Sequence, residues 1–403
     1  MSSIFKWMDD RFPIVSTWKA HISEYYAPKN FNFYYFFGSL AMLVLVNQLL
    51  TGLWLTMFYT PSAAEAFNSI EYIMRDVNYG WFLRYLHSTG ASAFFIVIYL
   101  HMFRGLLYGS YQNPRELVWL LGVALFILLM AEAFFGYLLP WGQMSYWGAQ
   151  VITSLFGAIP FVGDTIITWL RGDYNVANAT LQRFFALHVI GVPLLLLILV
   201  FLHIVALHKV GSNNPEGIEI KKHLNEKGKP LDGIPFHPYY TVKDFMGVIV
   251  FLIFFFSVVF FYPEMGGYFL EHANFAPADP MTTPDHIAPV WYMTPFYAML
   301  RAVPDKLFGV MVMLGSILIF LFVPWLDKSK VRSIRYKGPY SKYALTLFVI
   351  SFIILGYLGT VSVTPIKQYL ARICAVIYFA YFLLMPLYTR YERTLPVPER
   401  ITR

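Results

Sequence analysis

The sequence predicts an all-α integral membrane protein with eight transmembrane helices, the first four of which form a four-helix bundle. Three observations lead to this fold class. Of the 403 residues, 58% are hydrophobic and only 13% are charged, whereas soluble domains carry about 25% charged residues. Eight segments are apolar over the roughly 20 residues that a helix needs to cross a bilayer. The loops between these segments alternate between strongly basic and acidic or nearly neutral.

The predicted helices follow one another along most of the chain. Helix is the expected conformation because it closes every backbone hydrogen bond within one segment in lipid. The segments are Phe33–Tyr59, Tyr85–Phe103, Leu117–Leu139, Phe184–His208, Phe245–Tyr262, Leu307–Leu326, Tyr343–Ile366 and Ile373–Thr389. Pro289–Leu300 is too short to span and is expected at the interface or folded back against the helices. We divide the chain into a four-helix domain at 1–210, a cytoplasmic linker at 211–242 and a second four-helix domain at 243–403.

Loop charge predicts the orientation of these helices. Lysines gather after the fourth segment, and lysines and arginines gather after the sixth. Because basic loops stay on the cytoplasmic side of a membrane, both termini are predicted to be cytoplasmic. The same rule accounts for the net charge of +7, so the lipid bilayer is an expected partner and nucleic acid is not.

Four histidines in the second and fourth segments are candidate heme ligands. His87 and His101 are 14 residues apart, and His188 and His203 are 15 apart. At 3.6 residues per turn, each pair lies roughly on one helix face, about 21–22 Å apart along the axis. Since both helices run in the same direction, His87 and His188 share an outer level, and His101 and His203 an inner level. Axial imidazoles hold hemes, and the single cysteine, Cys374, excludes a thiolate-held cluster. Hydrogen bonds between helices are the alternative role for such histidines.

Glycines and arginines support two heme sites at these levels. The first and third segments each hold two glycines 14 residues apart, namely Gly38, Gly52, Gly122 and Gly136. One glycine from each segment falls near each histidine level, where it allows a flat macrocycle to approach the backbone. Arg84, Arg104 and Arg183 lie three to five residues from a histidine and are expected to pair with heme propionates. Small residues also serve ordinary helix packing, so a purely structural interpretation stays open.

The sequence resembles the cytochrome b family of mitochondrial and bacterial bc complexes over nearly its whole length. The matching stretches are GWFLRYLHSTGASAFFIVIYLHMFRGLLYGSY (80–111), GYLLPWGQMSYWGAQVIT (136–153), GSNNPEG (211–217), PFHPYYTVKD (235–244) and PVWY (289–292). The resemblance implies a lower-potential b heme on His87 and His188 and a higher-potential b heme on His101 and His203. The unsplit chain with its eighth helix indicates the respiratory type of a bacterial inner membrane.

The resemblance also implies a function with two quinone sites. Ubiquinol would be oxidised at the outer face, with one electron going to a Rieske iron–sulfur protein. The other electron would cross the membrane through the hemes to quinone at the inner face, building a proton gradient. A membrane-anchored cytochrome c subunit and a dimer of the complex are further implied partners. A two-heme membrane anchor and a secondary transporter are the other classes considered.

The expected quinone-site residues fall into two groups. The inner site would use His208, Ser212 and Asp244, of which His208 and Asp244 are expected to exchange protons with the quinone. The outer site would be formed by the 140–153 region and the PVWY region. Its expected residues are Tyr137, Trp147, Pro289, Trp291, Tyr292 and the candidate catalytic residue Tyr297. Aromatic residues suit a flat apolar head group, although an aromatic belt at the membrane interface is the alternative.

Two departures from the family pattern lead to further predictions. Val290 stands where the family's outer-site motif usually has an acid, so another carboxylate must accept the quinol proton. Glu132 is our first candidate, because an acid within a membrane helix is costly unless it is used or paired, and Glu264 is our second. For Glu132 the alternative is a structural hydrogen bond or pairing with Arg183, and for Glu264 it is an ordinary solvated loop acid. The second departure is the spacing of 15 in the fourth segment, where Pro193 is expected to mark a kink or bulge.

Overall fold

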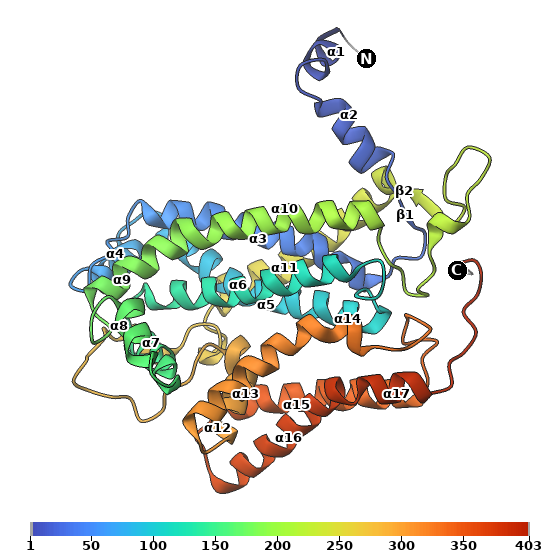
Figure 1. Cartoon of the computed structure of the whole chain (residues 1–403). Coiled ribbons are helices and arrows are strands. Elements are labelled where there is room, and N and C mark those ends of the chain that lie inside the picture. Colours follow the sequence, from blue (N-terminus) through green and yellow to red (C-terminus); the bar gives the residue numbers. More distant parts are fainter. Residues whose placement is uncertain (1–2, 402–403) are drawn as a thin grey trace.

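Eight helices of the described chain, residues 3–401, are long and apolar enough to cross a membrane. In this computed structural model they run side by side along one direction (Figure 1). The spans are Phe33–Thr56, Gly80–Tyr108, Glu116–Leu138, Asn178–Val210, Phe236–Phe261, Lys306–Leu326, Pro339–Thr360 and Pro365–Leu383. The prediction of an all-α membrane protein with eight spans is therefore confirmed, because each span overlaps its predicted segment.

The first four spans contain α3 (Phe36–Thr56), α5 (Gly80–Tyr108), α6 (Glu116–Leu138) and α10 (Val192–Val210). Helix α3 packs along α5, and α6 packs along α10. The fourth span begins with α9 (Asn178–Ala186), which continues into α10 through a π-helical turn, η4 (Leu187–Gly191).

The second half of the chain packs against this bundle through α11 (Thr241–Phe261), which contacts both α3 and α5. The remaining helices are α12 (Thr294–Ala302), α13 (Lys306–Leu318), α14 (Val323–Leu326), α15 (Pro339–Thr360), α16 (Pro365–Leu383) and α17 (Met385–Tyr391). Short α12 folds back against α15 and α16, as predicted for Pro289–Leu300. One apolar core joins the two halves, since Phe95 and Phe126 of the first half belong to the same cluster as Phe296 and Leu355.

The two ends of the bundle differ in their connections (Figure 1). One end carries α4 (Ala66–Arg75), α7 (Gln143–Leu155) and α8 (Gly163–Arg171). The opposite end carries both chain termini, α1 (Ser3–Asp9), α2 (Ile14–Trp18) and a two-stranded antiparallel sheet. Its strands are β1 (Tyr26–Pro28) and β2 (Gly233–Pro235), with Tyr26 opposite Pro235. The lysine-rich loop after α10 therefore lies at the same end as the termini.

A buried carboxylate fastens three distant segments at the end that carries the termini. Asp232 is fully buried, accepts a hydrogen bond from Arg400 Nε at 2.6 Å and lies 3.2 Å from Lys29 Nζ. Burial alone would raise its pKa, but the hydrogen bonds from Arg400, the Ile401 backbone and Lys29 together lower the pKa of Asp232 to about 2. Asp232 thus holds the segment that follows β1 and the C-terminal tail against the linker.

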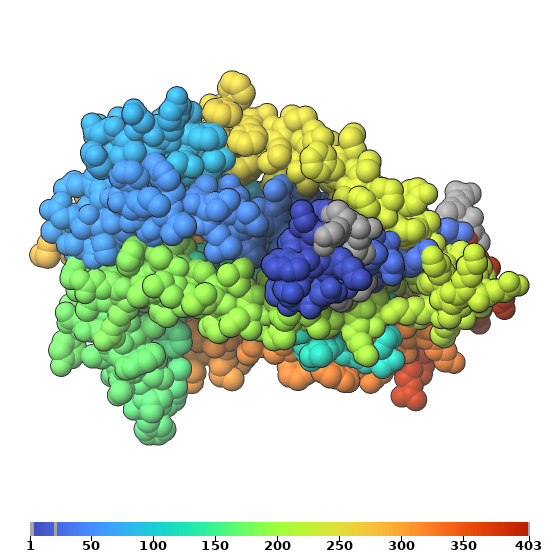
Figure 2. Space-filling view, turned by 90° about the horizontal axis from the view of Figure 1, so that it is seen from above, coloured from blue at the N-terminus to red at the C-terminus, as the bar shows by residue number. Residues whose placement is uncertain are grey.

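Large apolar side chains cover the outer faces of several spans. Figure 2 looks onto the side of the molecule that carries α3, α10 and α11. On α10 Phe201 is 66% exposed and on α11 Phe254 is 70% exposed, and many of the large apolar residues along both helices are similarly exposed. Soluble proteins rarely expose contiguous apolar surface of this extent, so these faces are built to contact lipid.

The prediction was wrong about where the seventh span ends and the eighth begins. Helix α15 ends at Thr360 and not at Ile366, and α16 begins at Pro365 and not at Ile373. Thr364 caps α16 by accepting a hydrogen bond from Lys367 N, and proline at the first helical position is pre-organised for the helix. The charges of Lys367 and Arg372 had placed the predicted start too late. Arg372 Nε instead donates to the carbonyl of Ala302 at 2.8 Å, at the end of α12.

Candidate functional site

The outer pair of histidines faces across the first bundle. His87 lies on α5 and His188 in the π-helical turn η4, with ring centroids 6.1 Å apart and ring planes at 88°. Thr51 Oγ1 lies 2.9 Å from His87 Nδ1, and the backbone carbonyl oxygen of Glu132 lies 3.0 Å from His188 Nδ1. These contacts fix both Nδ1 atoms and leave Nε2 of each ring as the available ligand atom.

The inner pair repeats this arrangement between α5 and α10. The ring centroids of His101 and His203 are 6.4 Å apart. Arg104, one helical turn beyond His101, brings Nη2 to 3.4 Å from His101 Nδ1, and its guanidinium carbon lies 5.0 Å from the Tyr35 ring centroid. Within residues 3–401, the buried Nε of Arg104 has no hydrogen-bond partner. A buried donor of this kind suits an anionic group such as a propionate.

The spacing of both pairs fits a metal held between two imidazoles. Two rings bound to opposite sides of one metal, with metal–nitrogen bonds of about 2.0–2.1 Å, have centroids about 6.3 Å apart. Both observed separations, 6.1 and 6.4 Å, match this value. Among the described residues, no group of three or more His, Cys, Asp or Glu side chains converges on a metal site. A macrocycle would therefore have to supply the remaining ligands, as heme does.

Each of the four predicted glycines lies against a different histidine. A Cβ atom would come within 2.4 Å of His188 at Gly136 and 3.1 Å of His87 at Gly52. At the inner level the same distances are 3.3 Å from Gly122 to His203 and 3.6 Å from Gly38 to His101. Ordinary helix packing does not require this one-to-one pairing, so the residues present fit two hemes.

The extra residue between His188 and His203 is absorbed by a bulge, as predicted. The turn η4, which contains His188, is π-helical and ends at Gly191, two residues before Pro193. Proline has no N–H, so the carbonyl four residues before it loses its α-helical donor. A π-turn accommodates one additional residue, which brings His188 back to the face that carries His203.

Two of the three arginines predicted to pair with heme propionates lie within one helical turn of a candidate heme ligand, and the third forms a hydrogen bond outside the histidine pairs. Arg84 precedes His87 by three residues and Arg104 follows His101 by three on α5. Arg183, on α9, donates a hydrogen bond from Nη1 to the carbonyl of Trp169 at the end of α8. Its guanidinium is thus engaged with the α8–α9 connection.

Two of the predicted inner-site residues, His208 and Ser212, lie beside Tyr25, which the sequence did not single out. The Tyr25 ring lies 4.7 Å from the His208 ring, and its hydroxyl is 3.2 Å from Ser212 Oγ. On the neighbouring α11, Asp244 Oδ2 accepts a hydrogen bond of 2.6 Å from Ser39 Oγ. Ser39 follows Gly38, which contacts His101. The Asp244 end of the predicted site therefore lies near the inner histidine pair.

The aromatic residues of the PVWY region are fixed against α5. Trp291 Nε1 donates to Ser92 Oγ at 3.0 Å. Tyr292 is buried and stacks on Phe95 with ring centroids 3.8 Å apart, while Pro289 is only partly buried. This region therefore forms a rigid wall beside the outer half of the bundle.

The second predicted wall, α7, is tied to the loop that follows α11. Trp147 Nε1 donates to the carbonyl of Asp279 at 3.2 Å, and the side-chain carbonyl of Gln143 accepts from Asp279 N at 2.7 Å. Tyr137, at the end of α6, lies under α7 and donates a hydrogen bond of 2.5 Å to Glu271 Oε2. Sequence reasoning gave Glu271 no role, because a loop has no periodicity that would place it opposite Tyr137.

The two predicted proton acceptors are both engaged by histidines. Glu132 Oε1 lies 3.0 Å from His188 Nδ1, so its carboxylate contacts an expected heme ligand and not Arg183. Glu264 Oε2 lies 3.4 Å from His272 Nε2, and the Glu264 side chain is 38% exposed. Glu132 is therefore placed to orient His188, and Glu264 lies at the rim of the molecule.

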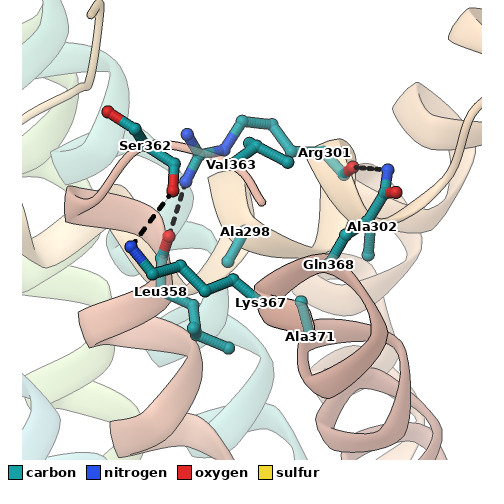
Figure 3. Close-up of a pocket in the computed structure, with 9 residues that line it drawn as sticks. All are labelled: Ala298, Arg301, Ala302, Leu358, Ser362, Val363, Lys367, Gln368 and Ala371. Carbon is teal, nitrogen blue, oxygen red and sulfur yellow. Dashed lines mark hydrogen bonds between the residues drawn. The ribbon is translucent and has the colours of Figure 1, made fainter. Parts of the chain in front are cut away.

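A small cavity of about 10 Å³ lies where α12, α15 and α16 meet (Figure 3). It has room for about one water molecule and none for a quinone. Arg301 crosses it and donates from Nη2 to the carbonyl oxygens of Leu358 at 2.6 Å and Val361 at 3.2 Å, at the end of α15. The same guanidinium lies 4.6 Å from the Tyr297 ring, and Tyr297 donates to the carbonyl of Ile287 at 3.0 Å. The cavity thus belongs to the scaffold that positions Tyr297.

Fold and site together define a multi-pass helical membrane protein in which two pairs of histidines face each other across the first helix bundle. Comparison with known proteins specifies the family. Residues 22–211 match the family model described as Cytochrome b/b6/petB, and residues 277–379 match Cytochrome b(C-terminal)/b6/petD. The chain belongs to the cytochrome b family, whose members bind heme b.

Individual relatives match over almost the whole chain. A protein named Cytochrome b from Allochromatium vinosum is 62% identical, with 98% of this chain and 97% of the relative covered. Cytochrome b from Rickettsia bellii is 50% identical, with coverages of 99% and 97%. A solved structure named Hyperthermophilic respiratory Complex III has a TM-score of 0.89 at 39% identity, covering 96% of this chain and 99% of its own.

Proposed function

We propose that this chain is the cytochrome b subunit of a bacterial quinol–cytochrome c reductase that oxidises ubiquinol and translocates protons. The observation that carries the proposal is the pair of facing histidine sites, each spaced for one metal and backed by two glycines. Similarity to a protein named as respiratory Complex III supports a role within such an assembly. Its proposed partners are a Rieske iron–sulfur protein, a membrane-anchored cytochrome c subunit and a second copy of the complex.

Two b hemes would be held by His87 with His188 and by His101 with His203, with Arg84 and Arg104 as propionate partners. Each heme, when bound, accepts and passes on one electron. The chain's own residues orient the ligands, since Thr51 and Glu132 contact the Nδ1 atoms of the outer pair. Because basic loops stay on the cytoplasmic side of a membrane, the basic linker supports a cytoplasmic location for the inner site and both termini.

Quinone at the inner site would lie between His208 and Asp244, near Ser212. A histidine and a carboxylate can exchange protons with a quinone near neutral pH. Ser39 orients the Asp244 carboxylate through its hydrogen bond. Quinol at the outer site would lie between the Tyr137–Trp147 wall and the wall formed by Pro289, Trp291 and Tyr292, near Tyr297. Uptake of protons at one face and release at the other would build the gradient.

The heme assignment is tested by removing one ligand at each level. In His188→Leu we expect loss of the lower-potential b signal, and in His203→Leu loss of the higher-potential signal, in redox-titrated spectra of membranes that contain the whole complex. His237→Leu is the matched control, because this exposed histidine lies outside both pairs. Retention of both signals in His203→Leu would refute the assignment. Quinol–cytochrome c activity of the purified complex separates this function from that of a simple heme anchor.

A further inference from the structure

The proposed outer site lacks an obvious acceptor for the quinol proton. Val290 is apolar and packs against the main core. Glu132 contacts His188, and Glu264 lies beside the exposed His272. Oxidation of a quinol nevertheless requires a base within hydrogen-bond reach of its hydroxyl, so a carboxylate near both walls is needed.

Glu271 lies at the outer end of the first bundle. Its Oε2 accepts a hydrogen bond of 2.5 Å from the Tyr137 hydroxyl, and that hydroxyl in turn accepts one of 2.9 Å from Asn274 Nδ2. Oε1 takes no hydrogen bond from the residues that the structure describes, so this oxygen is left for another partner. Burial raises the pKa of Glu271, although the Tyr137 hydrogen bond opposes the rise. A partly desolvated carboxylate with one free oxygen is suited to accept a proton.

The loop around Glu271 connects both walls of the proposed quinol site. Two residues before it, Phe269 stacks on Trp291 with ring centroids 6.2 Å apart and planes at 20°. Three residues after it, Asn274 Oδ1 accepts a hydrogen bond of 2.8 Å from Ser145 N, at the start of α7. Glu271 is therefore held between the PVWY wall and the α7 wall, which is where a quinol head group would be bound.

Glu271 is also close to the outer histidine level and to solvent. Its partner Tyr137 follows Gly136, whose backbone lies against His188. The next residue, His272, has a side chain that is 69% exposed and lies 3.4 Å from Glu264. A proton received at Glu271 is thus next to a titratable pair that reaches the surface.

We propose that Glu271 accepts the quinol proton at the outer site, in the role that an acid at position 290 would otherwise have. This inference rests on the proposed function. In the step, a quinol O–H bond breaks and its proton bonds to Glu271 Oε1, while Tyr137 stays hydrogen-bonded to Oε2. The second quinol proton and one electron would pass to the iron–sulfur partner, and the outer heme, when bound, would take the other electron. Quinol is oxidised to quinone, and both one-electron acceptors are reduced.

The test is Glu271→Gln in the assembled complex, which keeps a hydrogen-bond acceptor for Tyr137 but removes the base. We expect quinol-driven reduction of the outer heme, with the inner site blocked, to slow at least about 10-fold. The pH dependence assigned to Glu271 should also disappear. The other titratable groups near Glu271 are Tyr137 from α6, Tyr292 from the PVWY wall, and His272 and Glu264 of the same loop. Their contributions should remain.

Three further measurements distinguish the loss of the Glu271 base from a general defect of the complex. Asp285→Asn, an exposed acid of the same loop, should keep the wild-type rate. Adding Val290→Glu to Glu271→Gln should restore part of the rate, and the carboxyl band that appears in infrared difference spectra on quinol oxidation should vanish in Glu271→Gln. If Glu271→Gln keeps both hemes and the wild-type rate at every pH, the proposal for Glu271 is overturned. If the wild-type complex reduces no heme with quinol, the proposed function itself fails.

Discussion

At the scale of single residues, Glu132 is placed to act on the proposed outer heme through His188. Its Oε1 and its backbone carbonyl oxygen both lie 3.0 Å from His188 Nδ1. A carboxylate in this position fixes the tautomer and the orientation of a ligating imidazole and makes it more basic. Glu132 is therefore a positioning residue in our proposal. Its pairing with His188 offsets the unfavourable free energy of burying a carboxylate within a membrane helix.

Replacing Glu132 with Gln should raise the reduction potential of the outer heme. The substitution removes a carboxylate that makes His188 more electron-donating, while the backbone carbonyl still holds Nδ1, so the heme stays bound. The expected rise is tens of millivolts, where 59 mV corresponds to a tenfold change in a one-electron equilibrium. Potentiometric titration of the b signals measures it, with the inner heme as internal control. An unchanged outer potential would contradict this role.

At the scale of helices, α3 and α6 each carry two glycines that leave room for the histidines of their neighbours. The clearance differs among them, because a Cβ would come within 2.4 Å of His188 at Gly136 but only within 3.6 Å of His101 at Gly38. A contact below about 3 Å forces one of the groups to move, whereas 3.6 Å is ordinary van der Waals contact. The outer site is therefore more tightly specified by its glycine than the inner site.

Gly136→Ala should displace His188 and abolish or strongly reduce the outer heme signal. Gly38→Ala on α3 is the matched control, because this glycine faces His101 of the inner pair at an ordinary contact distance, and it should leave both signals in place. Heme spectra of membranes from the two variants, each normalised to the amount of assembled protein, measure the difference. Equal heme content in the two variants would show that the close approach at Gly136 is unnecessary.

Sequence patterns predicted the helices well and their loops poorly. Hydropathy located every span, and the spacing of 15 with Pro193 predicted the bulge, because both depend on regular helical geometry. The turn between α15 and α16 was misplaced, because a charged residue such as Arg372 can lie within a span when a neighbouring backbone carbonyl accepts its hydrogen bond. The contact between Tyr137 and Glu271 joins residues far apart in sequence through an irregular loop, where no periodicity exists to indicate it.

At the scale of the whole molecule, the end that carries the termini is held together by a buried cluster of charges. Asp232 in the linker accepts hydrogen bonds from Arg400 Nε and from the Ile401 backbone, and it pairs with Lys29. Nearby, the apolar side chains of Ile218, Ile220 and Ile401 form their own small cluster. The linker is thereby joined to both termini, next to the β1–β2 sheet that lies beside Tyr25 of the proposed inner site.

Asp232→Asn should lower the thermal stability of the purified complex at neutral pH, because it removes the charge that Arg400 and Lys29 share. The sign of the pH dependence follows from the pKa of Asp232, about 2 in the folded protein and about 3.9 in an unfolded chain. A carboxyl group whose pKa is lowered by folding contributes stability above about pH 4, and the contribution is lost as the pH falls toward 2. The difference in Tm between wild type and variant should therefore be constant from pH 7 to about 5 and shrink below pH 4.

Asp10→Asn, which alters an exposed acid near the N-terminus, should change Tm little at any pH. A Tm difference for Asp232→Asn that stays the same down to pH 3 would mean that packing of this carboxyl group, and not its charge, stabilises the junction.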